Sequence, residues 1–342
     1  MPPRRFQFMS LLSFSEKGIY CAQAQLYIDP WRPVKKALIT HAHADHARWG
    51  SENYLAHHLS VPVMRQRLGE DIKAQGIAYG EKIRINGVQF SFHPAGHIPG
   101  SAQIKASYRG ERWVVSGDYK LGDDGLSEAF EPVQAEHFIT ESTFGLPVYR
   151  WPAQADVFAE INQWWRENKK AGKTSVLAGY SLGKAQRILK GLDPSIGKIF
   201  THGAVENVNA TLRALGITLP ETIQVRAEIP KSEYKGAMVV CPPSAIGSPW
   251  IKKFSPYVTG FCSGWMALRG ARRRRAADRG FVMSDHADWD ELNTAVAETG
   301  AEHVYVTHGY QQIFARWLRE EKGLHAKAVE TLFTGESPDQ DD

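Results

Sequence analysis

Residues 40–46 hold three imidazoles and a carboxylate within one short run that directly follows an apolar stretch. A single tetrahedral zinc ion takes about four ligands, so this density suits two adjacent cations better than one. His41 and His43 can begin one site, while Asp45 and His46 can begin a second. The alternative is a chance cluster of histidines on a solvated loop, with no metal bound. Further residues of ligand type elsewhere in the chain argue against it.

Four other residues of this type each follow a strand-like apolar run: Asp29, His97, Asp118 and His308. A buried strand that ends at a sheet edge releases its side chains to a loop, where sites are commonly built. Imidazole and carboxylate suit zinc and manganese. Two such cations, roughly 3.5 to 4 Å apart, can neutralise charge on a scissile group. The three cysteines lie elsewhere, so no thiolate ligand is expected.

The pattern His-x-His-x-Asp-His, followed in order by these residues, resembles the motifs of the metallo-β-lactamase superfamily. The resemblance implies a first metal site of His41, His43, His97 and Asp118. It implies a second site of Asp45, His46, Asp118 and His308. Asp118 would then bridge two divalent ions, zinc or manganese. Asp29 would orient the histidine loop from outside the ligand set.

Length and composition fit a soluble enzyme of the cytoplasm. A chain of 342 residues suggests two domains, or one domain with a large insertion. Its three cysteines lack the even, close spacing of a disulfide framework, which indicates a reducing compartment. No segment has the apolar core of a signal peptide or a membrane span. The net charge of +4 permits an anionic substrate without requiring one.

The apolar pattern predicts an α/β chain. Several strand-like runs are expected on one face of a sandwich: residues 10–21, 26–28, 36–39, 83–92, 104–108 and 113–115. A helix is expected over residues 153–170, and the spacing of Trp164 and Trp165 favours a place in the core over a base-stacking platform.

The following stretch alternates strands with helices. Strands are expected at residues 174–178, 198–200 and 237–241, and helices after residues 179–186 and over residues 204–215. This alternation predicts an inserted α/β module. A strand that starts at Phe281 is expected to return the chain to the first domain. The predicted domains are residues 1–148, an insert at residues 149–279, and a return to the first domain over residues 280–342.

An insert between Asp118 and His308 resembles the β-CASP branch of the superfamily, whose members cut nucleic acids. Glu141 resembles the acid of the branch's motif A, His286 resembles motif B, and His308 occupies motif C. The resemblance implies an αββα sandwich that carries an inserted α/β β-CASP domain. It also implies catalytic roles for Asp45, Asp118, Glu141 and His286.

Two stretches, residues 179–187 and 264–289, resemble most closely the bacterial ligase-associated DNA exonucleases. The implied function is a DNA exonuclease of repair that acts with an ATP-dependent DNA ligase and a helicase. His308 departs from this reading, because RNA-processing members such as RNase J carry histidine at motif C, whereas Artemis-like DNA enzymes have an apolar residue. RNA processing is therefore the alternative, and the resemblance over the whole chain favours DNA.

Residues for the reaction and for substrate binding follow from their charge. His286 can donate a proton to the leaving oxygen, and Glu141 can orient its ring and keep it protonated. Ser181 and Lys184, near an expected helix start, can bind a phosphate, although Ser181 also fits a simple helix cap. An arginine run can line the path of a nucleic-acid backbone or form an ordinary solvated surface: Arg272, Arg273, Arg274 and Arg275.

Two other function classes stay open. A small-molecule hydrolase, such as a lactonase or thioesterase, would share the histidine-rich core but has no use for the insert, Glu141 or His286. An inactive nucleic-acid-binding subunit is the other possibility. The intact ligand set argues against an inactive subunit, because inactive paralogues usually lose it.

Overall fold

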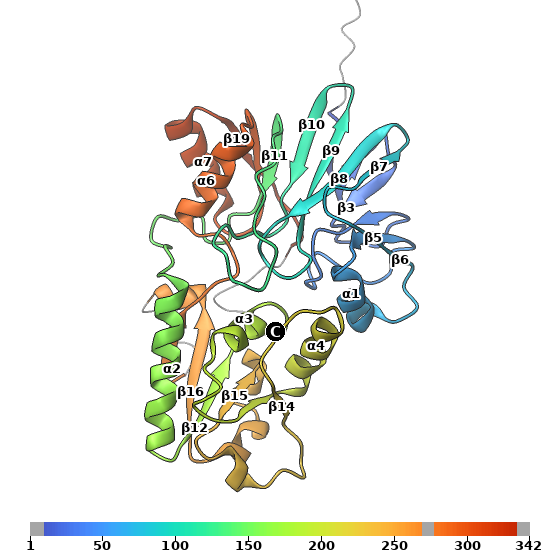
Figure 1. Cartoon of the computed structure of the whole chain (residues 1–342). Helices are drawn as coiled ribbons and strands as arrows, with labels where there is room; N and C mark the ends of the chain where they lie inside the picture. The colour runs from blue at the N-terminus through green and yellow to red at the C-terminus, as the bar shows by residue number, and fades with distance from the viewer. Residues whose placement is uncertain (1–9, 269–276, 334–342) are drawn as a thin grey trace, which may run out of the picture.

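The structure is a computed structural model that describes residues 10–268 and 277–333. Within these residues the strands form three sheets, two of them close together and the third in a separate unit (Figure 1). Helices lie against the sheets, so the chain has the α/β fold class expected from its sequence. None of the helices in the described part is long and apolar enough to cross a membrane.

The first sheet has six strands, in the order β1-β2-β3-β4-β5-β6. They are β1 (Ser13–Ser15), β2 (Gly18–Cys21), β3 (Leu26–Ile28), β4 (Ala37–Leu38), β5 (Tyr54–His57) and β6 (Ala74–Ile77). Strands β1 to β3 pair antiparallel, and β3 to β6 pair parallel. Helix α1 (Ser60–Leu68) joins β5 to β6. Because β3 and β4 are parallel, the loops that follow them open at the same sheet edge.

The second sheet has seven strands, in the order β19-β18-β11-β10-β9-β8-β7. They are β7 (Lys82–Ile85), β8 (Val88–Pro94), β9 (Ala102–Tyr108), β10 (Glu111–Val115), β11 (His137–Thr140), β18 (His303–Val306) and β19 (His325–Ala328). Strands β7 to β10 pair antiparallel, and β10, β11, β18 and β19 pair parallel. Helices α6 (Trp289–Thr299) and α7 (Gln311–Lys322) accompany the parallel half.

These two sheets pack face to face, with one helical layer outside each. Strand β10 shows the arrangement, because its side chains alternate between two cores. Trp113 and Val115 belong to the core that the two sheets share, while Val114 packs with residues of α6 and α7. On the far side, α1 covers the first sheet through Met64. The order of layers is therefore helix, sheet, sheet, helix.

The sequence analysis placed the strand-like runs between residues 10 and 115 on one face of a sandwich, and this expectation is wrong. The runs before residue 40 lie in the first sheet, and those after residue 82 lie in the second. Alternation of apolar residues shows that a strand buries one face, but it does not show which neighbour the strand pairs with.

The third sheet, in the separate unit, is entirely parallel, in the order β14-β13-β15-β12-β16-β17. Its strands are β12 (Thr174–Ala178), β13 (Ile199–Thr201), β14 (Ile223–Gln224), β15 (Met238–Cys241), β16 (Tyr257–Ser263) and β17 (Arg279–Val282). Its helices are α2 (Gln154–Lys170), α3 (Lys184–Gly191) and α4 (Gly203–Ala214), with short 3-10 turns η1 (Lys231–Tyr234), η2 (Pro243–Ala245), η3 (Pro249–Phe254) and η4 (Gly264–Ala267). Trp164 and Trp165 of α2 are buried in its core, as expected.

Strand β17 corrects the expected return of the chain. A strand beginning at Phe281 was expected to rejoin the first domain, but β17 pairs with β16 in the third sheet through Cys262 and Phe281. The chain therefore leaves the third sheet only after Val282, and the predicted boundary at residue 280 cuts through a strand. Phe281 is the buried residue of this four-residue strand, and one buried residue does not show which sheet the strand joins.

Candidate metal centre

The residues expected to bind metal lie on loops that follow the carboxyl ends of four strands. His41 to His46 follow β4, while the other three follow β8, β10 and β18 in turn: His97, Asp118 and His308. In the second sheet these three strands run in the same direction, because β9 separates β8 from β10 by two antiparallel pairings. Their loops therefore open at one edge of the sheet.

At this edge the side chains gather into two clusters whose ligand atoms lie within 4.8 Å of one another. The first cluster is His41, His43, His97 and Asp118. The second is Asp45, His46 and His308. These are the two ligand sets that the sequence resemblance implied, with Asp118 grouped in the first. Coordination of a metal by these residues stays a prediction.

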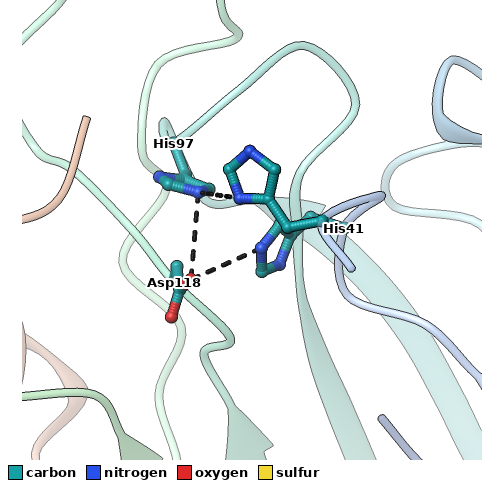
Figure 2. A group of neighbouring side chains, drawn as sticks. His41, His97 and Asp118 are labelled. Atoms are coloured by element: carbon teal, nitrogen blue, oxygen red, sulfur yellow. Dashed lines mark hydrogen bonds and ion pairs between the residues drawn. The ribbon is translucent and has the colours of Figure 1, made fainter. Parts of the chain in front are cut away.

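Asp118 joins the two clusters. Its Oδ2 atom lies 3.4 Å from Nε2 of His41 and 3.9 Å from Nε2 of His97, and Figure 2 shows this carboxylate beside both rings. The same oxygen lies 3.5 Å from Nε2 of His46 in the second cluster. One buried carboxylate thus stands within reach of a cation in either cluster, as a bridging ligand must.

The donor atoms fit divalent cations. Of the eleven buried side-chain atoms without a hydrogen-bond partner in the described residues, four belong to the two clusters: Nε2 of His41, His46 and His308, and Oδ1 of Asp118. A buried polar group left unpaired costs about 1–3 kcal/mol, so several in one place call for an explanation. Cation ligation explains them, because it uses the lone pairs that are left unpaired. The imidazole and carboxylate set suits zinc or manganese.

Asp29, directly after β3, holds the histidine loop. Its Oδ1 accepts the backbone N–H of Thr40 at 2.7 Å, and its Oδ2 lies 2.7 Å from Nδ1 of His46. The Thr40 hydroxyl also donates to Oδ2, at 2.5 Å. A carboxylate on Nδ1 keeps the proton there and directs the Nε2 lone pair toward the cluster. Asp29 is therefore outside the ligand set, in the place that the resemblance implied.

Other imidazoles are also held through Nδ1. His97 donates to the backbone carbonyl of Asp285 at 2.8 Å, so a ligand of the first cluster is fixed by the segment that follows β17. Gly96 lets the His97 loop approach Asp118. It has a φ of +74°, and a Cβ there would lie 2.0 Å from the carbonyl oxygen of Lys120. Glycine is needed because any side chain would push these two loops apart.

Burial sets the charge state of most of the imidazoles. Removal from water lowers the pKa of His41 to about 4, and it also lowers the pKa values of His43, His97 and His308. These rings are therefore neutral near pH 7, the form that binds metal. His46 differs. Burial opposes its charge, but the surrounding carboxylates, Asp118 first, raise its pKa well above the ordinary value.

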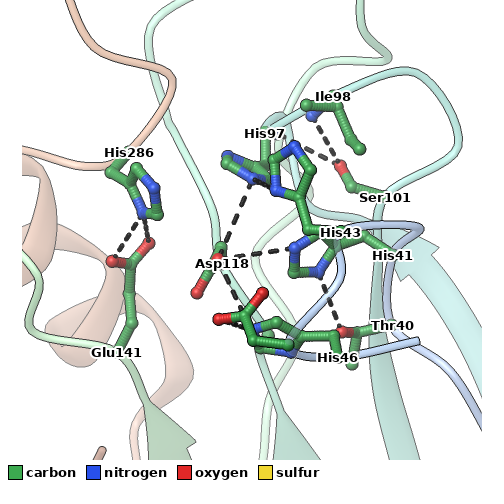
Figure 3. A network of polar contacts seen from close by, with 12 residues as sticks. Thr40, His41, His43, His46, His97, Ile98, Ser101, Asp118, Glu141 and His286 are labelled. Atoms are coloured by element: carbon green, nitrogen blue, oxygen red, sulfur yellow. Dashed lines mark hydrogen bonds and ion pairs between the residues drawn. The ribbon is translucent and has the colours of Figure 1, made fainter. Parts of the chain in front are cut away.

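Glu141 and His286 form a hydrogen-bonded pair beside the clusters. Nδ1 of His286 lies 2.9 Å from Oε2 and 3.1 Å from Oε1 of Glu141 (Figure 3). Tyr119 donates its backbone N–H to the same carboxylate at 2.9 Å. The ring of His286 lies 4.7 Å from that of His97, centroid to centroid. Ligand-type atoms of Glu141, His286 and Asp118 lie within 4.8 Å of one another, so this pair borders directly on the first cluster.

A cavity of about 630 Å³ opens onto this arrangement. One wall carries His43, Asp45, Asp118 and His286. The opposite wall comes from α1, the third-sheet unit and its loops: Gln66, Arg67, Tyr180, Ser181, Leu182, Ala204, Asn207, Val208, Pro242 and Pro243. The cavity is of the size that takes a small ligand or one unit of a polymer.

No protein-family model matches the chain. The chain is 31% identical over 315 residues to a probable DNA ligase of Opitutus terrae, a match that covers 91% of this chain and 30% of that protein. It is 29% identical over 206 residues to the ribonuclease TTHA0252 of Thermus thermophilus, covering 51% of this chain and 44% of that protein. It is 30% identical over 119 residues to the RNase aCSPSF2 of Saccharolobus solfataricus, covering 33% and 23%.

This chain therefore spans less than half the length of each of these three relatives. Among solved structures, it is similar to a protein of unknown function from Enterococcus faecalis V583. The TM-score is 0.59 and the identity 12%, over 86% of this chain and 79% of that one. At this identity the likeness concerns the fold alone.

The structure separates the predicted substrate-binding residues. Ser181 lines the cavity. Lys184 does not: its side chain is fully buried, and Nζ lies 3.1 Å from Oδ1 of Asp285. The prediction that Lys184 binds a phosphate is therefore wrong. Helix α3 begins at Lys184 with Gly183 as its cap, so Ser181 is not the cap either. Arg272, Arg273, Arg274 and Arg275 lie outside the described residues.

Sequence reasoning missed a buried ionic network around the loop that carries His286. The side chain of Arg187, on α3, makes two contacts. Its Nη2 atom lies 2.6 Å from Oδ2 of Asp124, and its Nη1 atom donates to the carbonyl of Ser284 at 2.5 Å. The Lys184–Asp285 pair lies beside it. A signal was present: Lys184 and Arg187 are three residues apart on the helix face that also carries the apolar Ile188, and charges on such a face need buried partners.

Proposed function

We propose that the chain is a two-metal nuclease of the β-CASP branch of the metallo-β-lactamase superfamily, which hydrolyses phosphodiester bonds. The observation that carries this proposal is the pair of ligand clusters that share Asp118 at one wall of the cavity. The Glu141–His286 pair beside the clusters could donate a proton, a role that a protein which only stores metal does not need.

Two divalent cations, zinc or manganese, would be held by the two clusters and would supply Lewis-acid stabilisation of the charge on the phosphate. His286 donates a proton to the oxygen of the leaving strand. Glu141 fixes the ring by its contact with Nδ1 and favours the protonated form. Asp45 and Asp118 line the cavity and would supply negative charge to hold the cations.

We favour DNA as the substrate and an exonuclease of repair as the role. The relative named as a probable DNA ligase matches 91% of this chain, whereas the two ribonucleases match 33% and 51%. In that relative the matching part belongs to a protein named for ligation, which supports a functional association with a DNA ligase. The expected helicase partner rests on the sequence resemblance alone.

RNA processing is the second candidate. Two of the three relatives described above are named as ribonucleases, and His308 stands at the position where RNA-processing members carry histidine. The position of His308 within the second cluster fits either substrate, because it concerns the metal and not the sugar.

The substrate path is proposed to pass Ser181 and the four arginines Arg272, Arg273, Arg274 and Arg275. For a single strand, log affinity falls with log salt by about 0.7 for each phosphate contact. The double variant Arg273→Ala, Arg274→Ala should therefore flatten the salt dependence by roughly one to one and a half units. Equal slopes of log affinity against log salt for the variant and the original chain would show that these arginines form an ordinary solvated surface and do not contact the nucleic acid.

The proposed function is tested with single-stranded DNA and RNA of identical sequence, labelled at either end, in the presence of zinc or manganese. We expect progressive shortening of the DNA and slower cleavage of the RNA. Asp118→Ala should abolish both reactions, and the matched control Asp71→Ala, at an exposed position, should leave them unchanged. Faster cleavage of RNA would favour the second candidate, and cleavage of neither polymer would contradict the proposal.

A further inference from the structure

Residues 329–333, which follow β19, cross the edge of the second sheet where the ligand loops open. Val329 donates its backbone N–H to the carbonyl of Val306, at the end of β18 and two residues before His308. Further on, Arg48 donates to the carbonyl of Leu332 at 2.6 Å. The segment is thus tied at both ends to strands and loops that carry the second cluster.

Arg48 also holds the second cluster's own loop. Its Nε donates to the carbonyl of Asp45 at 3.2 Å, and its Nη1 donates to the carbonyl of Trp31 at 3.4 Å. One guanidinium therefore connects the ligand loop, the loop after Asp29 and the segment ending at Phe333. A planar group with five donors in a fixed fork is suited to joining three carbonyls in this way.

The segment places the ring of Phe333 flat against two imidazoles of the second cluster. The ring centroid lies 4.6 Å from that of His46, at an interplanar angle of 11°, and 4.4 Å from that of His308, at 14°. The two imidazoles are themselves nearly parallel, at 8°. Trp31 also contacts Phe333, with the two ring centroids 5.3 Å apart and the ring planes at 88°. Phe333 is therefore packed against rings, which restricts how the imidazoles can turn.

The orientation of these rings decides where their lone pairs point. Nδ1 of His46 is held by Asp29, and Nδ1 of His308 lies 3.0 Å from the Thr307 hydroxyl. A hydrogen bond at one nitrogen leaves the ring able to rock about that contact. A flat ring stacked on both imidazoles limits this motion, and it presents an apolar face instead of water.

The two clusters also differ in their exposure to the cavity. His43 and Asp118 of the first cluster line it, whereas His46 and His308 do not. The second cluster reaches the cavity through Asp45 alone. The face of the two imidazoles that Phe333 covers is thus separate from the opening through which a substrate would approach.

We propose that Phe333 is a positioning residue for the second metal site, which holds the rings of His46 and His308 parallel and keeps water from them. This inference rests on the proposed two-metal function and deepens it. It assigns the binding of the second cation in part to a side chain that does not touch a metal or the substrate.

The test is metal binding by the full chain, followed without any nucleic acid. Metal-free protein is titrated with cobalt(II), whose visible absorption reports coordination geometry, and the two affinities are resolved by competition with a chelator. Phe333→Ala should weaken one of the two binding steps by about 10- to 100-fold, the effect typical of a lost outer partner of a metal ligand. The other step and its spectrum should be unchanged.

Conservative variants separate stacking from simple apolar cover. Phe333→Tyr keeps the flat ring and should bind both ions with the original affinities, whereas Phe333→Leu keeps an apolar side chain and should behave as Phe333→Ala does. The matched control is Ile313→Ala, which removes an apolar side chain that is 51% exposed on α7. It should change neither step.

Three results overturn the inference. They are unchanged affinities in Phe333→Ala, equal weakening of both steps, and full retention of the second step in Phe333→Leu. If the chain binds two ions but cuts no nucleic acid, the proposed function is wrong and the inference about Phe333 still holds. A chain that binds only one ion would overturn both.

Discussion

The two walls of the cavity are built in different ways. The wall from the packed sheets carries two imidazoles and two carboxylates, those of His43, His286, Asp45 and Asp118, and the ring of His286 is held by Glu141. The wall from α1 and the third-sheet unit presents mainly small, amide and apolar residues, such as Ser181, Asn207 and Pro242. The groups that could bind metal or transfer a proton are thus concentrated on the first wall, while the second wall mainly sets the shape of the cavity. We expect changes to the first wall to abolish the reaction and changes to the second to alter only its affinity.

The largest effect is expected from Asp118→Ala, because this carboxylate reaches both clusters. Turnover should fall by more than about 10⁴-fold, beyond the loss typical of a missing general acid. Elemental analysis should show fewer than two ions per chain. Full activity with two bound ions would show that Asp118 is not a bridging ligand.

His286→Ala should come next, with a loss of about 10² to 10⁴ in rate. Metal content and substrate affinity should be retained, because the proposed role is proton donation. Glu141→Gln should show a milder form of the same defect. His58→Ala, at an exposed position, is the matched control. Release of a metal from His286→Ala would instead make His286 a ligand, which its distance to Asp118 allows.

A change behind the second wall should act through stability. Arg187→Met leaves Asp124 buried without its partner, which typically costs about 3–5 kcal/mol of the free energy of unfolding. Denaturant unfolding measures this. The double variant Arg187→Met, Asp124→Asn should regain most of the loss, because it removes the unpaired charge and keeps the Oδ1 atom that accepts from the backbone N–H groups of Leu126 and Ser127. A double variant as unstable as the single one would show that the network also positions the loop of His286 through Ser284.

The smallest effect is expected from Asn207→Ala on the second wall. Loss of one hydrogen bond to substrate, worth about 0.5–1.5 kcal/mol, should raise KM by about 2- to 10-fold and leave kcat unchanged. Gln163→Ala, on the exposed side of α2, is the control. A fall in kcat equal to that of His286→Ala would contradict the division of labour between the two walls.

The sequence predicted the first wall better than the second, for a physical reason. Residues of ligand type are uncommon and follow strands at a strict spacing, so His43, Asp45 and Asp118 can be picked out from the sequence, and the structure places all three at the cavity. The residues that shape the second wall are of common types and follow no such spacing. Lys184 looked like a phosphate binder, although its position on an apolar helix face meant burial and pairing with Asp285.

Strand pairing and distant contacts were the other limits. Strand β17 was assigned to the wrong sheet, because a four-residue strand with one buried residue, Phe281, fits either sheet equally well. Phe333 was not noticed, since nothing in its neighbourhood shows that it will meet His46, which is 287 residues away in the sequence. The same holds for the Asp285 carbonyl, because every residue has a carbonyl and only the fold brings this one to His97.

The hydrogen bond from His97 to the Asp285 carbonyl can form only after residue 285 has been synthesised. A ribosome adds about 5–20 residues per second, so His308 emerges roughly 10 to 50 s after the histidine loop, and Asp285 only shortly before it. Throughout that interval the first cluster lacks the backbone contact that orients His97, and the second cluster lacks one of its three members. The nascent chain therefore carries an incomplete centre until residue 308 has emerged from the ribosome.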